Sequence, residues 1–371
     1  MTRSPNTDSR YAIPFIDLKS QYNAYKEEID EAIQRVLSSS QFILGPEVEA
    51  LEEQLAEFTG SKYAIGCSSG NDALLLSLMA IDLQPEDEVI VPAFTFFSTA
   101  EVVSFLKAKP VFVDVCEKSY NMDYRLIEDK ITSKTKAIIP VALYGQPADM
   151  DEINAIAKKH NLIVIEDAAQ SFGAEYKGKK SCNLSDFGCT SFFPSKPLGC
   201  YGDGGAIFTN DEHLAKKLKS LRAHGQTKRY THEYIGINGR LDALQAAILQ
   251  VKLKYFPNEI QNRQEVASIY NTAFGEKAPK VLKDRTHMFA QYTVQVENRE
   301  EVIKKLKEVG IPTAVHYPIP LHKQPVYASS ANLALPISEK LSKHVLSLPM
   351  SAFLSEADQQ NIIEIIQEIL S

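Results

Sequence analysis

Short apolar runs alternate with helical patterns between residues 61 and 210, and this alternation most constrains the fold. Five compact runs of strand length occur there, at 63–67, 88–91, 110–115, 137–141 and 162–165. Runs that are apolar throughout indicate strands buried on both faces. Helical patterns separate these runs, at 71–81, 98–107, 124–130 and 151–160. We therefore predict right-handed crossovers and an α/β fold with a mostly parallel sheet covered by helices.

The pattern changes after residue 242. Two further strands, at 188–192 and 206–209, are joined by a glycine-rich stretch and complete the first region. Beyond them the sequence predicts helices at 242–255, 259–274, 300–309 and 356–370, with one strand at 291–296. We therefore expect a large domain at 12–256 and a smaller α+β C-terminal domain at 257–371, divided near 256–258.

Composition and charge exclude several classes of protein. The 371 residues carry 40 Lys and Arg against 47 Asp and Glu, a net charge of −7, and no long basic block. Binding to nucleic acid or to an anionic membrane requires a basic face, so we expect neither partner. No apolar stretch approaches the length of a membrane span. The five cysteines are odd in number and scattered, which favours a reducing cytoplasm over a disulfide framework or a structural zinc site. We expect no bound metal.

A single lysine lies in a stiff loop directly after a predicted strand. The strand at 188–192 continues into Phe-Pro-Ser-Lys-Pro at 193–197, so prolines bound the segment that holds Lys196. Most lysines are simply exposed. Here, partial desolvation would lower the pKa of the amine from its reference value of about 10.4, as a nucleophilic amine requires. The glycine-rich stretch at 199–205 precedes a strand and not a helix, so it predicts close backbone packing and not a dinucleotide-binding loop.

Three other segments end at the same edge of the predicted sheet, where ligands of open α/β sheets bind. The strand at 162–165 runs into Glu166 and Asp167, which places a carboxylate at the rim. A helix cap or a structural ion pair would use the same residues. Small residues at 67–72 open a helix whose free N–H groups suit a phosphate. Aromatic residues at 92–98 would either stack on a ligand or pack in the core.

Together these four features match the requirements of pyridoxal 5′-phosphate (PLP). A lysine forms a Schiff base with this cofactor, and a carboxylate keeps its pyridine nitrogen protonated so that the ring acts as an electron sink. A helix start holds the phosphate, and an aromatic side chain stacks on the ring. The order along the chain is phosphate cradle, aromatic plate, aspartate and lysine, as in fold-type I PLP enzymes. We therefore expect PLP as the cofactor.

Four motifs carry a resemblance to a known family. They are Ile-Leu-Gly-Pro-Glu at 43–47, Glu-Asp-Ala-Ala-Gln at 166–170, Ser-Phe-Phe-Pro-Ser-Lys at 191–196 and Gly-Ile-Asn-Gly-Arg-Leu-Asp at 236–242. With them the chain resembles the sugar aminotransferases of the DegT/DnrJ/EryC1/StrS family from residue 15 to near the C-terminus. The resemblance implies a fold-type I PLP-dependent aminotransferase. It also implies an obligate homodimer with shared active sites.

The resemblance further implies roles for individual residues. Lys196 would be the catalytic lysine, which carries the cofactor and moves a proton on its amine, and Asp167 would pair with the pyridine nitrogen. The other implied cofactor contacts are Gln170 at the phenolic oxygen, Phe96 stacked on the ring, Ser191 with Gly70 and Asn71 at the phosphate, and Asn238 reaching the phosphate site of the partner subunit. Many members have threonine where this chain has Asn71, so the expected contact there is through the backbone.

A narrower likeness, carried by residues 191–210 and 316–321, concerns the substrate. It implies transfer of an amino group from L-glutamate to a 3-keto UDP-N-acetylhexosaminuronic acid, for the biosynthesis of surface polysaccharide such as O-antigen. A hexuronate carboxylate suits the bidentate geometry of arginine, and we expect substrate contacts from Arg240, His316 and Tyr317. For His316 the alternative is a loop histidine without a ligand role. We expect Arg229 to be solvated and not bound to the diphosphate.

Four other functions stay open. The same chemistry could act on a 4-keto-6-deoxy or 3-keto-6-deoxy sugar linked to UDP or dTDP. A non-catalytic PLP-binding regulator would bind the cofactor without performing a half-reaction. PLP-dependent dehydratases of the same fold carry histidine at the position of Lys196, which argues against that activity. A metabolic α/β enzyme without PLP would require the agreement of all the motifs to be a coincidence.

Overall fold

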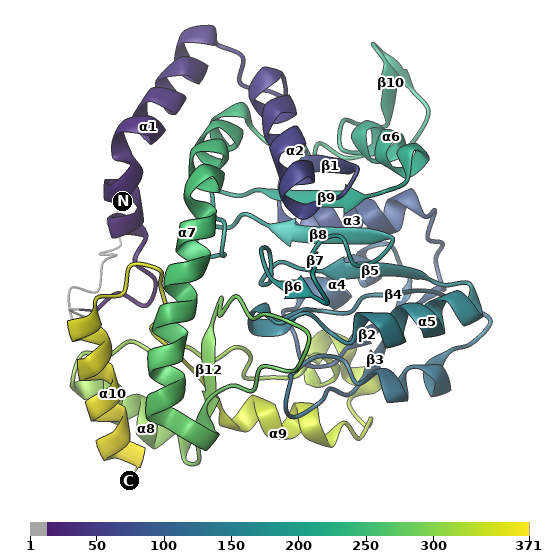
Figure 1. The fold of residues 1–371 in the computed structure, drawn as a ribbon. Helices are drawn as coiled ribbons and strands as arrows, with labels where there is room; N and C mark the ends of the chain where they lie inside the picture. Colours follow the sequence, from purple (N-terminus) through teal and green to yellow (C-terminus); the bar gives the residue numbers. More distant parts are fainter. Residues whose placement is uncertain (1–12, 371) are drawn as a thin grey trace, which may run out of the picture.

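A seven-stranded sheet forms the centre of the computed structural model, which describes residues 13–370 (Figure 1). Its strand order is β1-β9-β8-β5-β4-β2-β3. The strands are β1 (Tyr63–Cys67), β2 (Glu88–Pro92), β3 (Lys109–Val113), β4 (Thr135–Ile138), β5 (Ile163–Asp167), β8 (Phe187–Ser191) and β9 (Gly205–Thr209). All neighbours from β8 to β3 pair in parallel, whereas β9 is antiparallel to both β1 and β8. The prediction of a mostly parallel sheet is confirmed.

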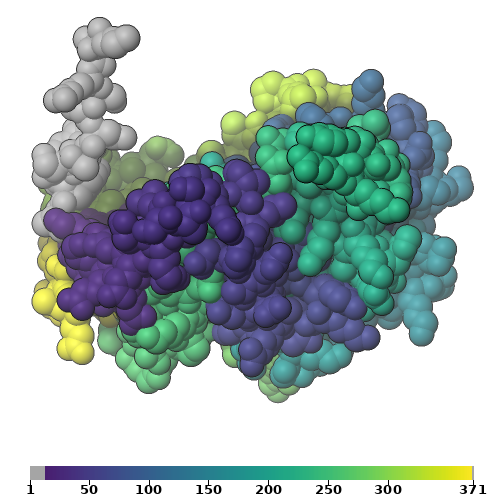
Figure 2. Space-filling view, turned by 90° about the horizontal axis from the view of Figure 1, so that it is seen from above, coloured from purple at the N-terminus to yellow at the C-terminus, as the bar shows by residue number. Residues whose placement is uncertain are grey.

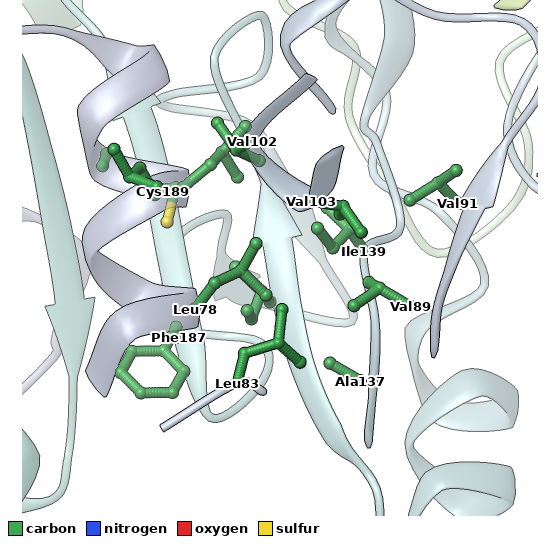
Figure 3. Packing of buried hydrophobic residues seen from close by; sticks show 14 of the residues in the cluster. Leu78, Leu83, Val89, Val91, Val102, Val103, Ala137, Ile139, Phe187 and Cys189 are labelled. Atoms are coloured by element: carbon green, nitrogen blue, oxygen red, sulfur yellow. The ribbon is translucent and has the colours of Figure 1, made fainter. Parts of the chain in front are cut away.

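Helices cover both faces of this sheet. They are α2 (Pro46–Thr59), α3 (Gly70–Ala80), α4 (Ser98–Phe105), α5 (Met150–His160), α6 (Glu212–Leu221) and α7 (Ala243–Phe274). Helices α3, α4 and α6 bury apolar side chains against one face, and Figure 3 shows part of this cluster. Helices α2, α5 and α7 contribute to the clusters on the opposite face. Successive strand residues point to opposite faces, so Ile65 joins the first cluster and Ala64 the second. Covering both faces explains why the strands are apolar throughout.

Helix α7 differs from the sequence prediction, because the two helices expected at 242–255 and 259–274 are one continuous helix of 32 residues. Pro257 lies inside it. An internal proline costs a helix about 3 kcal/mol. Both halves of α7 are anchored by buried side chains, such as Leu249 before the proline and Tyr270 after it. Burial on both sides of Pro257 keeps the helix intact.

Residues 124–130 form two short 3₁₀ turns, η1 (Tyr124–Leu126) and η2 (Glu128–Lys130), where the sequence predicts a helix. Within this segment only Ile127 is buried. A longer helix would need a stripe of buried apolar residues, and none is present in 124–130.

The C-terminal part has its own small sheet and apolar cluster. Its elements are β12 (Tyr292–Gln295), α8 (Arg299–Glu308), α9 (Pro336–His344), β13 (Val345–Leu348) and α10 (Glu356–Leu370), and β12 pairs with β13 in antiparallel fashion. The second half of α7 packs with β12, α8, β13 and α10 in one cluster. A division near 256–258 stays a prediction, because α7 runs through that region without a break.

Several elements were not predicted from the sequence. They are α1 (Leu18–Ser39), α2, α6, α9, β13 and the hairpins β6 (Glu175–Tyr176)–β7 (Lys179–Lys180) and β10 (Gln226–Lys228)–β11 (Thr231–His232). Figure 2 shows the purple N-terminal helices spread across one face of the molecule, near the green segment that contains the β10–β11 hairpin. Within residues 13–370, no helix is long and apolar enough to cross a membrane.

Candidate functional site

Lys196 lies in a tight loop that follows β8 and returns beside β9. The loop closes on itself through hydrogen bonds from the N–H of Lys196 to the carbonyl of Phe193 (2.8 Å) and from the N–H of Cys200 to the carbonyl of Phe192 (2.7 Å). A Cβ atom at Gly199 would lie 2.4 Å from the carbonyl oxygen of Pro194, so only glycine fits there. This confirms the close backbone packing expected for the glycine-rich stretch. The loop therefore holds Lys196 at a defined place.

Asp167 and Lys196 are close enough for the charge of each to affect the pKa of the other. Asp167 ends β5 and is buried, which raises the pKa of its carboxyl group. The N–H of Ala169 (3.2 Å), the charge of Lys196 and the hydroxyl of Thr99 (3.1 Å) oppose that rise. Burial lowers the pKa of the Lys196 amine, and the charge of Asp167 opposes that change. A desolvated amine near a buried carboxylate is an arrangement suited to nucleophilic chemistry.

Glu166, the other acid of the predicted pair, is hydrogen-bonded to neighbouring groups of the protein. Its carboxyl group accepts hydrogen bonds from the hydroxyl of Ser181 (2.8 Å) and the N–H of Cys182 (2.8 Å). Burial raises its pKa to about 7. Neighbouring residues on a strand point to opposite faces, so only Asp167 of the two is turned toward Lys196.

A small, backbone-lined cradle lies where α3 begins, against Ser191 at the end of β8. Gly70 is the first residue of α3, and the hydroxyl of Ser69 caps the helix by accepting from the N–H of Asp72 (3.0 Å). A Cβ atom at Gly70 would lie 2.5 Å from Cβ of Ser191. The first N–H groups of a helix have no acceptor within it, so the turn at Gly70 and Asn71 offers donors to an anion. Oδ1 of Asn71 is buried without a hydrogen-bond partner in the described chain.

An exposed aromatic ring flanks the same region. Phe96 follows β2 and is 53% exposed, although its neighbours Phe94 and Thr95 are buried. Its ring centroid lies 5.7 Å from that of Tyr317. The ring is therefore free to take a flat ligand, which fits the predicted stacking role better than core packing does.

Gln170 connects this region to the segment that holds His316 and Tyr317. Its Oε1 accepts a 2.6 Å hydrogen bond from the N–H of Tyr144, and its Nε2 donates to the hydroxyl of Tyr317 at 3.3 Å. The hydroxyl of Tyr144 donates to the carbonyl of His316. Tyr144 is fully buried in the 3₁₀ turn η3 (Leu143–Gly145) and has a φ of 60°, a conformation that is unfavourable for tyrosine. Two hydrogen bonds, to Oε1 of Gln170 and to the carbonyl of His316, thus hold Tyr144 in place.

His316 lies close enough to Lys196 to sense its charge. Burial and, to a smaller extent, the charge of Lys196 together lower the pKa of His316 to about 4. Nδ1 of His316 shares a 2.9 Å hydrogen bond with the hydroxyl of Ser347. Burial and the charge of Asp167 raise the pKa of Tyr317. Both side chains therefore sit near the amine and the carboxylate as neutral groups at physiological pH.

The segment around Arg240 runs alongside the cradle. Arg240 forms an isolated antiparallel bridge with Cys67, and the carbonyl of Gly239 accepts a 3.0 Å hydrogen bond from the N–H of Ser68. Nε of Arg240 is buried without a hydrogen-bond partner in residues 13–370. Asn238, two positions earlier, is exposed. The structure thus places Arg240 next to the cradle and leaves the Asn238 side chain facing outward.

Two residues of this site were missed from the sequence. Thr99 holds the carboxylate of Asp167, and Tyr144 holds Gln170 and the peptide of His316. Both follow predicted strands at the edge where the ligand site was expected. That position was the available indication, but threonine and tyrosine are common residues after strands, and nothing else in the sequence distinguished these two.

The residues present fit PLP. They include the buried carboxylate of Asp167, the desolvated amine of Lys196, the exposed ring of Phe96 and a helix start that a Cβ at Gly70 would fill. Each of these groups corresponds to one part of the cofactor.

Comparisons with known proteins agree with this fit. Residues 23–367 match the DegT/DnrJ/EryC1/StrS aminotransferase family. The chain is 56% identical over 348 residues to the UDP-2-acetamido-2-deoxy-3-oxo-D-glucuronate aminotransferase of Pseudomonas aeruginosa, covering 93% of this chain and 97% of that protein. It is 47% identical over 364 residues to a pleiotropic regulatory protein of Geobacillus stearothermophilus, covering 96% and 98%. The crystal structure of NtdA from Bacillus subtilis with bound cofactor PMP (pyridoxamine phosphate) gives a TM-score of 0.91 at 32% identity, covering 99% of this chain and 87% of that one.

Proposed function

Because this chain belongs to the DegT/DnrJ/EryC1/StrS aminotransferase family, we propose that it transfers an amino group from L-glutamate to a UDP-linked 3-keto N-acetylhexosaminuronic acid. It is a PLP-dependent sugar-nucleotide aminotransferase of fold type I. The products are 2-oxoglutarate and a UDP-2-acetamido-3-amino-2,3-dideoxyuronic acid, a building block for surface polysaccharide such as O-antigen. The relative that is 56% identical bears the name of an enzyme acting on such a 3-oxo uronate.

The pairing of Lys196 with Asp167 carries this proposal. When bound, PLP supplies an electron sink for the bond-breaking step at the amino acid. Asp167, held ionised by its hydrogen bonds, keeps a proton on the ring nitrogen. Lys196 first holds the cofactor covalently. When free, its amine would serve as the group that takes up and returns the proton of the amino donor.

The remaining residues bind and orient. Ser191 and the Gly70–Asn71 turn hold the phosphate, Phe96 stacks on the ring, and Gln170 faces the phenolic oxygen. Gln170 is suited to this contact because its Oε1 is engaged by the N–H of Tyr144, so its ligand-facing end is the Nε2 amide, which donates one hydrogen to the hydroxyl of Tyr317 and has a second to donate. These groups bring the reacting atoms to Lys196 and exclude water from them.

Arg240, His316 and Tyr317 are proposed as the substrate contacts. The Nε of Arg240 is buried and has no hydrogen-bond partner in the described residues, so the guanidinium retains donors for a carboxylate. His316 stays neutral because of its low pKa and can share a hydrogen bond with a sugar hydroxyl. A uronate would pair with Arg240, whereas a neutral 6-deoxy sugar would leave that charge without a partner.

We propose that the enzyme is an obligate homodimer of the cytoplasm. Asn238 is exposed in this chain, as expected if it reaches the phosphate site of a partner subunit. Ile235 and Tyr230 nearby are 91% and 80% exposed, which suits a surface that a second subunit covers. The five cysteines are all free, which suits a reducing compartment.

A visible absorption spectrum tests the proposal. Purified enzyme should show the band of lysine-bound PLP, and L-glutamate should convert it to the pyridoxamine form. Adding back the 3-keto uronate should restore the first band, whereas a 4-keto-6-deoxy sugar should not. In Lys196→Ala the starting band should be absent and the half-reaction slower by about 10²- to 10⁴-fold, the usual contribution of a positioned proton-transfer group. In Arg240→Ala, L-glutamate should still convert the starting band, but the 3-keto uronate should no longer restore it.

The 47% identity to a pleiotropic regulatory protein supports one alternative function, that of a non-catalytic regulator. A non-catalytic regulator would bind PLP and show the same starting band. L-glutamate would then leave the spectrum unchanged, and so would other amino donors. That outcome would overturn the transaminase proposal while preserving the role of Lys196 in binding the cofactor.

A further inference from the structure

A second lysine is buried behind the loop that carries Lys196. Lys252 lies in the first half of α7 and is only 1% exposed. Its Nζ donates a 2.6 Å hydrogen bond to the carbonyl oxygen of Gly199. The same Nζ lies 4.3 Å from the centroid of the Tyr201 ring. Both contacts are made to residues at the base of the Lys196 loop.

Gln245 holds the same loop from the same helix. Its Oε1 accepts from the N–H of Tyr201 (2.8 Å), and its Nε2 donates to the carbonyl of Tyr201 (3.2 Å). Gln245 and Lys252 are seven residues apart, about two helical turns, so they lie on one face of α7. That face of α7 therefore binds three backbone groups at the base of the loop, one on Gly199 and two on Tyr201.

The charge on Lys252 is costly and requires an explanation. Burial lowers its pKa to about 8, while the charge of Glu259 opposes that change. No carboxylate in residues 13–370 lies within ion-pair distance of it, so its main partners are a carbonyl group and an aromatic face. An apolar side chain of similar length would fill the space without the desolvation penalty, which is several kcal/mol for a buried ion. Packing alone does not account for a lysine at this position.

We propose that Lys252 is a positioning residue that fixes the base of the loop and thereby places the amine of Lys196 for capture of the cofactor. In that step the nitrogen of Lys196 forms a bond to the aldehyde carbon of PLP, and the aldehyde oxygen leaves as water. The inference rests on the proposed role of Lys196. The cradle at Gly70, by contrast, belongs to a different element, α3, whereas the hydrogen bond of Lys252 goes to Gly199 in the Lys196 loop.

Because Lys252 is proposed to act on the Lys196 loop and not on the phosphate cradle, PLP and PMP should respond differently to its loss. PMP has an amine where PLP has an aldehyde. PMP occupies the same cradle but forms no bond to Lys196. In apoprotein of Lys252→Met, the rate of appearance of the lysine-bound PLP band should fall about tenfold or more, the effect of losing a charged hydrogen bond. The affinity for PMP, measured by calorimetry, should change less than about twofold. Lys252→Arg, which keeps the charge, should recover part of the rate.

Two further variants complete the experiment. Lys254→Met removes an exposed lysine of the same helix that pairs with Glu28, and it should leave both measurements unchanged. Gln245→Leu removes the other attachment of the loop and should slow PLP capture in the same way as Lys252→Met, which keeps the test valid if the latter does not fold. Equal weakening of PLP and PMP binding, or an unchanged capture rate, would overturn the inference. A band that persists in Lys196→Ala would instead overturn the proposed function.

Discussion

Oγ1 of Thr99 donates a 3.1 Å hydrogen bond to Oδ2 of Asp167, although the two residues are 68 positions apart in the chain. The other oxygen of Asp167 accepts from the N–H of Ala169 at 3.2 Å. Both carboxylate oxygens are therefore held, one from α4 and one from the turn after β5. This arrangement opposes the tendency of burial to neutralise the acid.

Thr99→Val should destabilise the ionised form of Asp167 relative to the protonated form, without changing the shape of the site. A hydrogen bond to a charged group contributes about 1.5–3 kcal/mol, so the half-reaction with L-glutamate should slow by about tenfold or more. Loss of the bond raises the pKa of Asp167, so the acidic limb of the pH–rate profile should move to higher pH. Stopped-flow absorbance across pH 5 to 8 measures both. Thr99→Ser retains the hydroxyl, and identical profiles for the two variants would contradict this role.

Gly70→Ala should disrupt the phosphate cradle. The added methyl group would lie 2.5 Å from Cβ of Ser191, so α3 or β8 must shift. Overpacking of this kind costs about 1–3 kcal/mol, which predicts PLP and PMP affinities lower by about five- to hundredfold. Fluorescence titration of the apoprotein measures the affinities. The double variant Gly70→Ala, Ser191→Gly removes the clashing atom and should regain thermal stability; if it does not, the clash is not the cause.

Tyr144→Phe should affect the substrate more than the cofactor. It removes the hydroxyl that donates to the carbonyl of His316, but the backbone N–H that binds Gln170 remains. A neutral hydrogen bond contributes about 0.5–1.5 kcal/mol, so KM for the sugar nucleotide should rise about two- to tenfold while PLP affinity stays the same. Tyr120→Phe is the matched control, because its ring packs on Tyr144 at 5.2 Å. Equal loss of cofactor affinity would contradict the prediction.

His287 should make folding stability depend on pH. Burial lowers its pKa to about 3 from 6.5, and its Nδ1 accepts a 2.8 Å hydrogen bond from the N–H of Phe289. Between pH 3 and 6.5 the unfolded chain binds a proton that the native state does not, so this residue reduces stability as pH falls below 6.5. Relative to the parent, His287→Gln should therefore gain about 1.4 kcal/mol per pH unit below that value. Urea unfolding from pH 5 to 8 measures the difference, and a pH-independent difference would refute the assignment.

Local patterns in the sequence were sufficient to predict the central architecture. The strands that bear the site were located within a few residues. Asp167 was expected just after its strand and is the last residue of β5, and Lys196 lies in the loop after β8. These features depend on the periodicity and order of residues within short segments, so they can be predicted without knowing how distant segments pack. The roles of the predicted site residues at the cofactor stay predictions for the spectroscopic experiments above.

The tertiary structure decided the contacts that hold those residues in place. Thr99, Tyr144 and Lys252 bind groups between 26 and 172 positions away, and nothing in the local sequence marks such partners. The same holds for α7, where Pro257 suggests a break but burial of both halves keeps one helix. Local periodicity determines which segments become strands and helices. The pairing of buried polar groups depends on how distant elements pack, because only that packing removes water and leaves each donor with one available acceptor.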